Sequence, residues 1–362
     1  MDRRKFLASA FAAGACLACA NRGAFAQPAG LGRRRVEVDG TPVRVVDVHC
    51  HCVVPEALSV LKGTPMEARF AGTLKSAFNN PPVETRIAAM DAQGVDVEVM
   101  SVNAFWYDAD VELSRRLIDV QNEGLSRMCK ASGGRLEAFA AVALQHPELA
   151  AQQLEHATKN LGLKGAAIGG TVAGVELSDK RFDVFWAKAE ELDSLIFLHP
   201  QNSSDATGIS GRVKGNGYLD NTIGNPLETT IAFSQMIFQG VFDRYPGLKI
   251  CGAHGGGYLP SYVDRSDAVC PTFPTRCTPG VPKLAPSEYL KRNIFVDSLV
   301  FTPEALRHLA EVCGPGQIMV GTDYGFPWVA DPVGHVMNTT TLSARDKIAI
   351  LGGTAARLLK LA

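Results

Sequence analysis

Residues 43–51 read Val-Arg-Val-Val-Asp-Val-His-Cys-His, a segment from which the architecture of the chain can be inferred. Four of its first six residues are valine, which favours a buried β-strand. Side chains two residues apart on a strand point to the same face, so His49 and His51 would project together from its end. Cys50 would face the opposite side, toward surrounding helices. A strand that ends in chemical groups is typical of parallel barrels, whose reactive side chains stand at the C-terminal strand ends.

Seven further short apolar runs follow the first strand, and amphipathic helical patterns lie between them. The runs are 95–102, 136–144, 163–169, 195–199, 249–254, 294–298 and 318–323, and the helical patterns are 83–93, 111–131, 148–161, 182–192, 227–243 and 303–312. Pro147, Pro226 and Pro303 each stand where a helix would begin, the position that tolerates proline. Eight strands alternating with helices predict an α/β protein, a closed (β/α)₈ TIM barrel. A doubly wound open sheet is the alternative, but the glycine-rich phosphate loop that usually follows its first strand is missing.

The composition agrees with one large folded domain. The chain has 362 residues, 46% of them hydrophobic, which is ample for a single core. Its 36 Lys and Arg residues balance 37 Asp and Glu residues, and the body of the chain has no basic run. This balance argues against nucleic-acid binding and predicts a small molecule as the partner.

The N-terminus resembles an export signal. Arg3-Arg4 precedes a small apolar stretch, and Ala24-Phe25-Ala26 offers a cleavage signal. We therefore expect a twin-arginine-type signal peptide over 1–26, a leader or linker over 27–42, and a single metal-dependent barrel over 43–362. The apolar stretch is too short to span a membrane, so the mature protein would be periplasmic. The alternative is a cytoplasmic protein with a non-functional leader.

The cysteines give one possible disulfide. Loss of Cys16 and Cys19 with the signal peptide would leave seven of nine cysteines, so at least one thiol is free. Cys270 and Cys277 are the pair that could form a disulfide in the periplasm, and two free thiols are the alternative. Cys52 lies beyond the first strand, where ligation of a metal by its thiolate is a further alternative.

Two more strand ends carry metal-ligand side chains. His199 ends the run 195–199, and Asp323 ends the run 318–323. A lone histidine is often a satisfied core residue, but its place at a strand end favours metal ligation. A carboxylate after an apolar run is costly to bury without a partner, which a metal would supply. With His49 and His51, the set predicts one divalent metal, zinc or a similar ion such as manganese, with a position left for water.

The sixth and seventh runs add further polar groups. His254 precedes Gly255-Gly256-Gly257 and is expected to act as a general acid or base, or as another ligand; a structural histidine is the alternative. Asp297 ends the seventh run, where it could accept a hydrogen bond from a ligand histidine. The fourth run lacks the terminal lysine that bridges two metals in some barrels, since Lys164 stands near its start. One metal is therefore expected.

The order of these motifs resembles the amidohydrolase-related family over about residues 44–361, and in particular its branch of 2-amino-3-carboxymuconate 6-semialdehyde decarboxylase and related non-oxidative decarboxylases. The stretches that carry the resemblance are Asp47-Val48-His49-Cys50-His51, Leu198-His199-Pro200, Asn225-Pro226-Leu227-Glu228-Thr229-Thr230, Tyr245-Pro246-Gly247-Leu248-Lys249-Ile250, Ala253-His254-Gly255-Gly256-Gly257, Gly321-Thr322-Asp323-Tyr324 and 351–359.

The resemblance implies roles for several residues. It implies that His49, His51, His199 and Asp323 bind the metal, and that His254 is an acid or base toward the metal-bound water or the substrate carbon. It also implies that Arg265 reaches a neighbouring subunit's site and grips a substrate carboxylate, so that the working unit is a homodimer. A surface salt bridge is the alternative for Arg265.

The chain departs from this branch at two substrate-binding positions. Gln201 stands where the decarboxylase has a tryptophan that packs on the substrate. A second carboxylate-binding arginine is expected in the loop after the first strand, and Arg69 is its candidate. These departures leave the substrate open while sparing the metal site.

The expected function is a metal-dependent non-oxidative decarboxylase, a carboxy-lyase acting on an unsaturated or aromatic carboxylic acid. The second hypothesis is a hydrolase of a lactone, ester or amide that uses the same metal. The third is an exported binding protein without catalysis. An intact set of polar strand-end groups argues against the third, because each one costs stability if it is idle.

Overall fold

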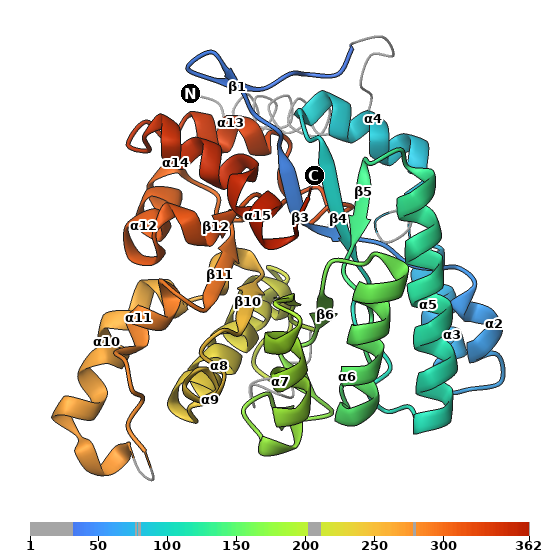
Figure 1. Cartoon of the computed structure of the whole chain (residues 1–362), viewed down its shortest axis with the longest axis horizontal. Helices are drawn as coiled ribbons and strands as arrows, with labels where there is room; N and C mark the ends of the chain where they lie inside the picture. Colours follow the sequence, from blue (N-terminus) through green and yellow to red (C-terminus); the bar gives the residue numbers. More distant parts are fainter. Residues whose placement is uncertain (1–31, 77, 79–80, 202–210, 278–279, 362) are drawn as a thin grey trace, which may run out of the picture.

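Eight parallel strands form a closed ring at the centre of the computed structural model (Figure 1). Five of them pair in the order β12-β11-β10-β9-β6 and three in the order β3-β4-β5. Bridges between Ala140 and Ala166 and between Asp47 and Val320 join the two sheets, so the predicted (β/α)₈ barrel is confirmed. The strands are β3 (Val46–His51), β4 (Val97–Ser101), β5 (Leu136–Ala138), β6 (Ala166–Ile168), β9 (Leu195–Leu198), β10 (Lys249–Gly252), β11 (Ile294–Asp297) and β12 (Ile318–Met319).

The structure describes residues 32–76, 78, 81–201, 211–277 and 280–361. The predicted signal peptide at 1–26 lies outside these residues. The helices are α2 (Ala57–Leu61), α3 (Glu67–Leu74), α4 (Val83–Gln93), α5 (Val111–Ala131), α6 (Pro147–His156), α7 (Asp183–Glu191), α8 (Asn225–Phe238), α9 (Val241–Arg244), α10 (Leu259–Thr272), α11 (Pro286–Leu290), α12 (Pro303–Cys313), α13 (Pro332–Met337), α14 (Ala344–Ile348) and α15 (Thr354–Leu358).

The predicted helices between the strands are present with small changes at their ends. α4 and α5 begin and end at the predicted residues, and Pro147 and Pro303 are the first residues of α6 and α12. The run predicted as one helix over 227–243 is divided into α8 and α9. Gly240 separates them in the left-handed conformation, with φ of 70°, which ends a helix.

Apolar side chains form two layers, one inside the ring and one between the ring and its helices. Phe139 and Phe197 stack inside the ring with their centroids 5.4 Å apart. α15 contributes Ala355 and Leu358 to the inner layer and packs against β3 and β12, so it closes the N-terminal end of the barrel. The C-terminal strand ends remain open, which is where the predicted site residues lie.

The segment predicted as a linker contains a short hairpin. β1 (Glu37–Val38) pairs antiparallel with β2 (Thr41–Pro42), and Val38 is buried against the outer layer. A second hairpin, β7 (Thr171–Val172) with β8 (Val175–Glu176), follows β6. Among the described residues, no helix has the length and hydropathy needed to cross a membrane.

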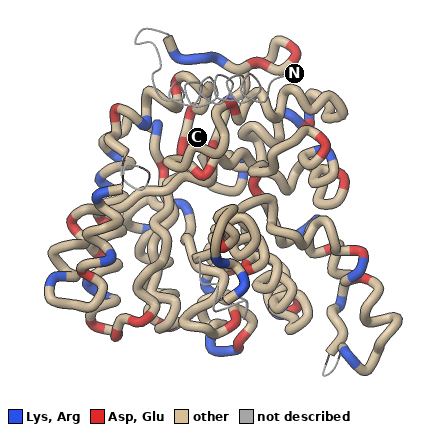
Figure 2. Tube along the Cα trace, turned by 180° about the vertical axis from the view of Figure 1, so that it is seen from behind, with Lys and Arg blue, Asp and Glu red and all other residues tan. Residues whose placement is uncertain are grey.

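One part of the chain extends away from the barrel. α10 and the turn that follows it project from the body in both views, below the orange α11 in Figure 1. A disulfide joins Cys270 at the end of this helix to Cys277 after the turn. Of the two alternatives open for these cysteines, the structure therefore has the bonded pair. Figure 2 also shows Lys and Arg interspersed with Asp and Glu along the chain.

Candidate metal centre

A bulge in β3 aims both of its histidines into the barrel. Val46 and Val48 belong to the inner apolar layer, so a regular strand would also turn residue 50 inward and the histidines outward. The pairing of β3 with β4 instead shifts by one residue between Asp47 and Cys50. This extra residue reverses the alternation, so His49 and His51 both point toward Asp323 at the mouth. The two histidines point in one direction, as predicted, and the bulge is what turns that direction into the barrel.

Four histidines and one aspartate meet at the mouth. One ligand atom from each of His49, His199, His254 and Asp323 lies within 4.8 Å of all the others. His51 joins them through Nε2, which is 2.6 Å from Oδ1 of Asp323. The rings of His51 and His199 have their centroids 4.7 Å apart. Residues from four strand ends, separated by up to 274 positions in the chain, are thus brought together as predicted.

The donor atoms of this cluster fit a metal ion. Nε2 of His49, both ring nitrogens of His51 and of His199, and Nδ1 of His254 are buried without a hydrogen-bond partner. Buried polar atoms are almost always satisfied, so a convergent group of unsatisfied nitrogens is unusual. Imidazole nitrogen with one carboxylate oxygen is a ligand set that zinc and other first-row divalent ions accept.

Asp297 supports the cluster from beneath. Its Oδ2 is 2.6 Å from Nδ1 of His49, which leaves Nε2 of that ring free to face the site. The same carboxylate accepts backbone N–H groups of His254, Gly255 and Leu299 at 2.9, 2.7 and 3.1 Å. Such a carboxylate behind a histidine fixes the orientation of a ligand ring. The structure therefore gives Asp297 the contact that the sequence suggested.

The electrostatics of the cluster favour a positive charge at its centre. Burial alone would lower the pKa of His49, but the nearby charge of Asp323, the hydrogen bond with Asp297 and the charge of Asp297 raise it to about 10. Burial opposes the charge of Asp323, yet His49 and His51 hold its pKa well below the usual value. Burial, with the nearby histidines, keeps the pKa of His199 well below 6.5. His199 is thus neutral and Asp323 is ionised, as metal ligands must be, whereas His49 carries between two carboxylates a proton that a bound metal cation would replace.

Two site residues have backbone conformations that are rare outside glycine. His254 and Asp323 have φ values of 57° and 60°, in the left-handed region. Each costs roughly 1–3 kcal/mol and persists only where the surroundings impose it. The glycines after His254 also have positive φ, and a side chain at Gly257 would collide with the carbonyl of Pro226. Gly257 thus allows the backbone to approach α8 closely.

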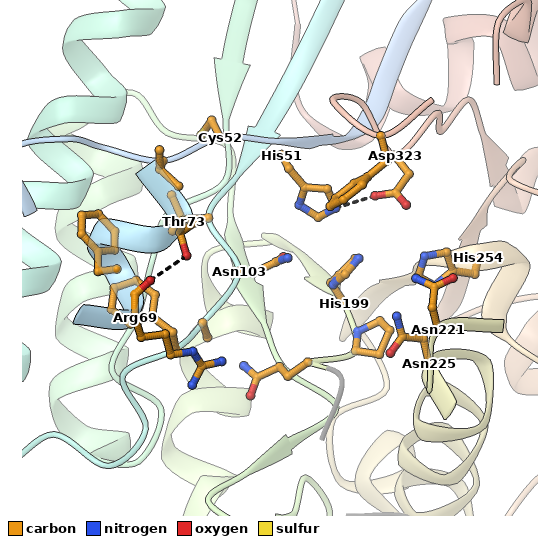
Figure 3. Close-up of a pocket in the computed structure, with 18 of the residues that line it drawn as sticks. His51, Cys52, Arg69, Thr73, Asn103, His199, Asn221, Asn225, His254 and Asp323 are labelled. Atoms are coloured by element: carbon orange, nitrogen blue, oxygen red, sulfur yellow. Dashed lines mark hydrogen bonds and ion pairs between the residues drawn. The ribbon is translucent and has the colours of Figure 1, made fainter. Parts of the chain in front are cut away.

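A pocket of about 190 Å³ opens above the cluster. Figure 3 shows His51, His199, His254 and Asp323 on one side of it and Arg69, on α3, reaching in from the other. Aromatic and amide side chains complete the lining. They include Phe70, Asn103, Phe105, Asn221, Asn225 and Phe326.

Gln201 lies in the pocket wall, as the sequence suggested. Its backbone N–H donates to the carboxylate of Glu228, and its side chain occupies the space left by the missing Cβ of Gly169. Its Nε2 is buried without a partner, so the amide can donate to a bound molecule. The position that carries a tryptophan in the resembled decarboxylase is therefore polar here.

Other predicted residues lie outside the cluster. Arg265 is exposed on α10 and does not line the pocket. Lys164 lies near Glu137, at 3.8 Å, so no lysine reaches the site from β6. Cys52 lines the pocket wall but is not among the four residues whose ligand atoms converge, and burial raises the pKa of its thiol to about 12.

Several functional candidates were not predicted from sequence. Asn225 is buried at the start of α8, and its Oδ1 has no partner; Glu228, one turn later, accepts the N–H of Gly170. Both belong to the stretch 225–230 that carries the family resemblance, which is the signal that could have singled them out. Three further pocket residues lie in segments that carry no such signal. Asn103 and Phe326 follow the strands β4 and β12, and Asn221 precedes α8.

Histidines and an ionised carboxylate converge at the C-terminal ends of the barrel strands. This arrangement is that of a metal-dependent barrel enzyme. The chain belongs to the amidohydrolase family, whose model matches residues 46–361. The cluster is a divalent metal site of that family.

Relatives of the chain include decarboxylases of carboxylated small molecules. It is 31% identical to 2-amino-3-carboxymuconate-6-semialdehyde decarboxylase of Dictyostelium discoideum, over 87% of this chain and 84% of that protein. The structure of 5-carboxyvanillate decarboxylase from Sphingomonas paucimobilis matches with a TM-score of 0.78 and 25% identity, over 88% of this chain and 100% of that one. Dihydroxybenzoic acid decarboxylase from Polaromonas sp. JS666, solved with manganese and 2-nitroresorcinol, has a TM-score of 0.72 and 26% identity, over 88% and 97%.

Proposed function

We propose that this protein is a metal-dependent carboxy-lyase that removes a carboxylate, without oxidation, from an aromatic or similarly unsaturated acid. The observation that carries the proposal is the convergence of four histidines with Asp323 below a pocket, in a chain related to decarboxylases. The three relatives described above favour this reaction over hydrolysis by the same metal.

In this proposal, His49, His51, His199 and Asp323 hold one divalent metal, and Asp297 orients His49. A bound metal supplies positive charge that stabilises negative charge on substrate oxygens. Zinc suits the three imidazoles and one carboxylate. Manganese is the competing candidate, since it is bound in the dihydroxybenzoic acid decarboxylase.

His254 is proposed to carry the proton. It would protonate the ring carbon that bears the carboxylate; the carbon–carbon bond then breaks, its electron pair restores the unsaturated ring, and carbon dioxide leaves. A histidine in reach of the reacting carbon can transfer a proton in this way. Support comes from its place beside the metal ligands and facing the pocket.

The pocket wall supports an aromatic, anionic substrate. Phe70, Phe105 and Phe326 offer apolar faces to a ring, and Arg69 supplies a guanidinium on the side away from the metal. We propose that Arg69 pairs with a substrate anion and that the amide of Gln201 donates to a polar ring substituent. Substrates with a hydroxyl group beside the carboxylate, such as dihydroxybenzoates and carboxyvanillate, are the first to test.

Metal analysis joined to an activity screen tests the proposal. The purified protein should hold about one divalent ion per chain, and elemental analysis identifies it. The variant His49→Ala/His51→Ala should lose the ion and the release of carbon dioxide. His308→Ala/His335→Ala is the matched control, because both residues lie outside the pocket and should leave the ion in place. A metal-loaded protein that hydrolyses lactones but decarboxylates nothing in the screen would favour the hydrolase instead.

We also propose that the working unit is a homodimer in which Arg265 completes the partner's site. This is supported by the exposure of Arg265 on a helix that projects from the barrel (Figure 1). Because Arg265 does not line the pocket of its own subunit, we propose that it reaches a substrate carboxylate in the other one.

Export by the twin-arginine route remains a proposal as well. The disulfide between Cys270 and Cys277 supports it, because such bonds persist in oxidising compartments. Cell fractionation of the protein and of its Arg3→Lys/Arg4→Lys variant tests it. The variant should stay in the cytoplasm, and an unchanged distribution would contradict export by this route.

A further inference from the structure

Arg86 is a buried guanidinium that stands behind the metal centre. It lies on α4, is 2% exposed, and donates from Nη1 to Oε2 of Glu98 on β4 at 2.5 Å. Its Nη2 donates to the backbone carbonyl of His51, also at 2.5 Å. Its Cζ lies 4.9 Å from the ring centroid of Tyr324. One side chain thus contacts the second strand, the last residue of the first strand, and the segment that carries Asp323.

These contacts lie at the seam where the barrel closes. β12 pairs with its neighbours over only two residues, Ile318–Met319, and its continuation reaches β3 through single bridges at Asp47 and at Cys50. His51 donates its backbone N–H to the carbonyl of Tyr324 across this seam. His51 and Asp323 therefore lie at a junction that is joined by isolated bridges rather than by a continuous ladder, and Arg86 contacts this junction from α4, outside the ring.

The stability of the fold does not by itself explain this arrangement. Taking a guanidinium and a carboxylate out of water is costly, and apolar residues of similar size often serve stability as well or better. Glu98 also keeps one oxygen, Oε1, without a partner. The guanidinium of an arginine is planar and has several N–H donors in fixed directions. It can therefore hold two or more acceptor groups at set positions.

We propose that Arg86 is a positioning residue that holds His51 and Asp323 in the geometry of the metal centre, acting through the His51 carbonyl and the Tyr324 ring. The inference rests on the proposed metal ligation by these two residues. It concerns the affinity and geometry of the metal rather than the chemical step. Residues behind metal ligands typically contribute about 10–100-fold to metal affinity.

Two substitutions separate positioning from folding. Arg86→Lys keeps the charge but not the fork, so it cannot hold Glu98 and the His51 carbonyl together. Arg86→Met/Glu98→Leu removes both charges at once and leaves no buried ion unpaired, so it should fold with a stability near that of the parent. In both variants we expect metal affinity to fall by about 10–100-fold.

Arg135, which directly precedes β5, provides a matched control. It donates to the backbone carbonyls of Asp96 and Val95 at 2.9 and 3.1 Å and pairs with Asp91 at 2.8 Å, all in the chain before β4 and none of them in the metal centre. Arg135→Met removes the same kinds of contact without touching the metal centre. It should lower the melting temperature but leave metal affinity unchanged.

The readouts are the dissociation constants of Zn²⁺ and Mn²⁺, measured by competition with a chromophoric chelator, and the visible spectrum of the Co²⁺-loaded protein. The proposal expects weaker binding and an altered Co²⁺ spectrum in folded Arg86 variants but not in Arg135→Met. Wild-type affinity and spectrum in the folded double variant would overturn it. If both Arg86 variants fail to fold, Tyr324→Leu, which removes only the ring contact, decides by the same two readouts.

The outcomes also separate this inference from the proposed function. A wild-type protein that binds metal tightly but releases no carbon dioxide contradicts the proposed reaction and leaves the metal-affinity test intact. A wild-type protein that binds no divalent metal contradicts both.

Discussion

His254 is the residue whose role can be separated most sharply from metal binding. It faces the pocket beside His49 and His199, but its ligand atom also lies within the 4.8 Å group that could hold a metal. His254→Asn keeps a polar side chain of similar shape but cannot carry a proton at neutral pH. We expect carbon dioxide release to fall by about 10²–10⁴-fold, with the metal content unchanged.

The measurement is a turnover assay together with metal analysis of the same samples. His335→Asn is the control, because His335 is a half-buried histidine on α13 outside the pocket. If His254→Asn still turns over normally, the proton-transfer role is wrong. If it loses the metal as well, His254 is a ligand rather than an acid or base.

At the scale of single residues, the sequence predicted those site residues that end strands. His49, His199, His254 and Asp323 each follow an apolar run, and barrel geometry then requires their ends to meet. Asn225, Glu228 and Arg86 were missed because they stand on helices. A helical side chain can face a strand, another helix or solvent, and only the packed structure shows which. Arg69 was proposed only from its position between the first strand and the next helix. In the structure it reaches the pocket because it stands on α3, a helix that was not predicted.

Among the secondary-structure elements, the strands are shorter than the apolar runs that predicted them, and several residues of the site lie beyond their ends. The run over 318–323 predicted a six-residue strand, but β12 covers only Ile318–Met319. The residues that follow turn into the mouth with Asp323 in a left-handed conformation, so they no longer join the ladder. A run of apolar residues indicates that a segment is buried. It does not distinguish buried residues within a strand from buried residues that follow it.

The bulge in β3 could not be predicted from sequence for a related reason. Apolar and polar residues alternate without a break along β3, from Val46 to His51, and all six are buried, so neither pattern marks the change of phase. Asp47 fixes the bulge, since its Oδ1 accepts the N–H of His49 and of Thr322 at 3.0 and 3.2 Å. Its Oδ2 accepts the hydroxyl of Thr322 at 2.5 Å, which joins the bulge to the segment after β12.

Thr322→Val tests whether the hydrogen bond from the Thr322 hydroxyl to Asp47 stabilises the junction between β3 and the segment after β12. Valine matches threonine in shape but leaves Oδ2 of Asp47 buried without its hydroxyl donor. We expect the free energy of unfolding to fall by about 1–3 kcal/mol, as measured by urea denaturation.

Thr339→Val is the matched control for that variant. Thr339 is equally buried, but its hydroxyl donates only to the carbonyl of His335, one turn earlier. Loss of this hydrogen bond should lower the free energy of unfolding by no more than about 0.5–1.5 kcal/mol. Equal losses in the two variants would mean that the bond between Thr322 and Asp47 has no special part in closing the barrel.

At the scale of the whole molecule, eight apolar runs and their intervening helices were enough to predict a closed barrel. The order of the strands followed from the right-handed, sequential connections of βαβ units. The projecting α10 was not predicted, because its pattern of side chains does not differ from that of a helix packed on the barrel. Its hydrophobic residues Tyr262 and Phe273 are 68% and 58% exposed, which suits a surface that meets another molecule.

Mixing two inactive variants tests whether Arg265 on this projecting helix completes a partner's site. Arg265→Met and His254→Asn should each be nearly inactive alone. In a hybrid dimer, the site of the Arg265→Met subunit keeps its own His254 and receives Arg265 from the other subunit. Random exchange of subunits makes half of the dimers hybrid, each with one intact site of two, so about one quarter of wild-type activity should return.

The size of the recovery distinguishes the alternatives for Arg265. If Arg265 acts in its own subunit, no hybrid dimer contains an intact site and mixing restores nothing. If it forms only a surface salt bridge, Arg265→Met is active before mixing. Arg307→Met is the control, because Arg307 is an exposed arginine on α12 that pairs with Glu311 one turn later, at 2.6 Å. Mixed with His254→Asn, it should give the simple average of the two activities, since its own sites are intact. A mixture of Arg265→Met with His254→Asn that is more active than the average of these two variants measured separately therefore requires a site shared between two subunits.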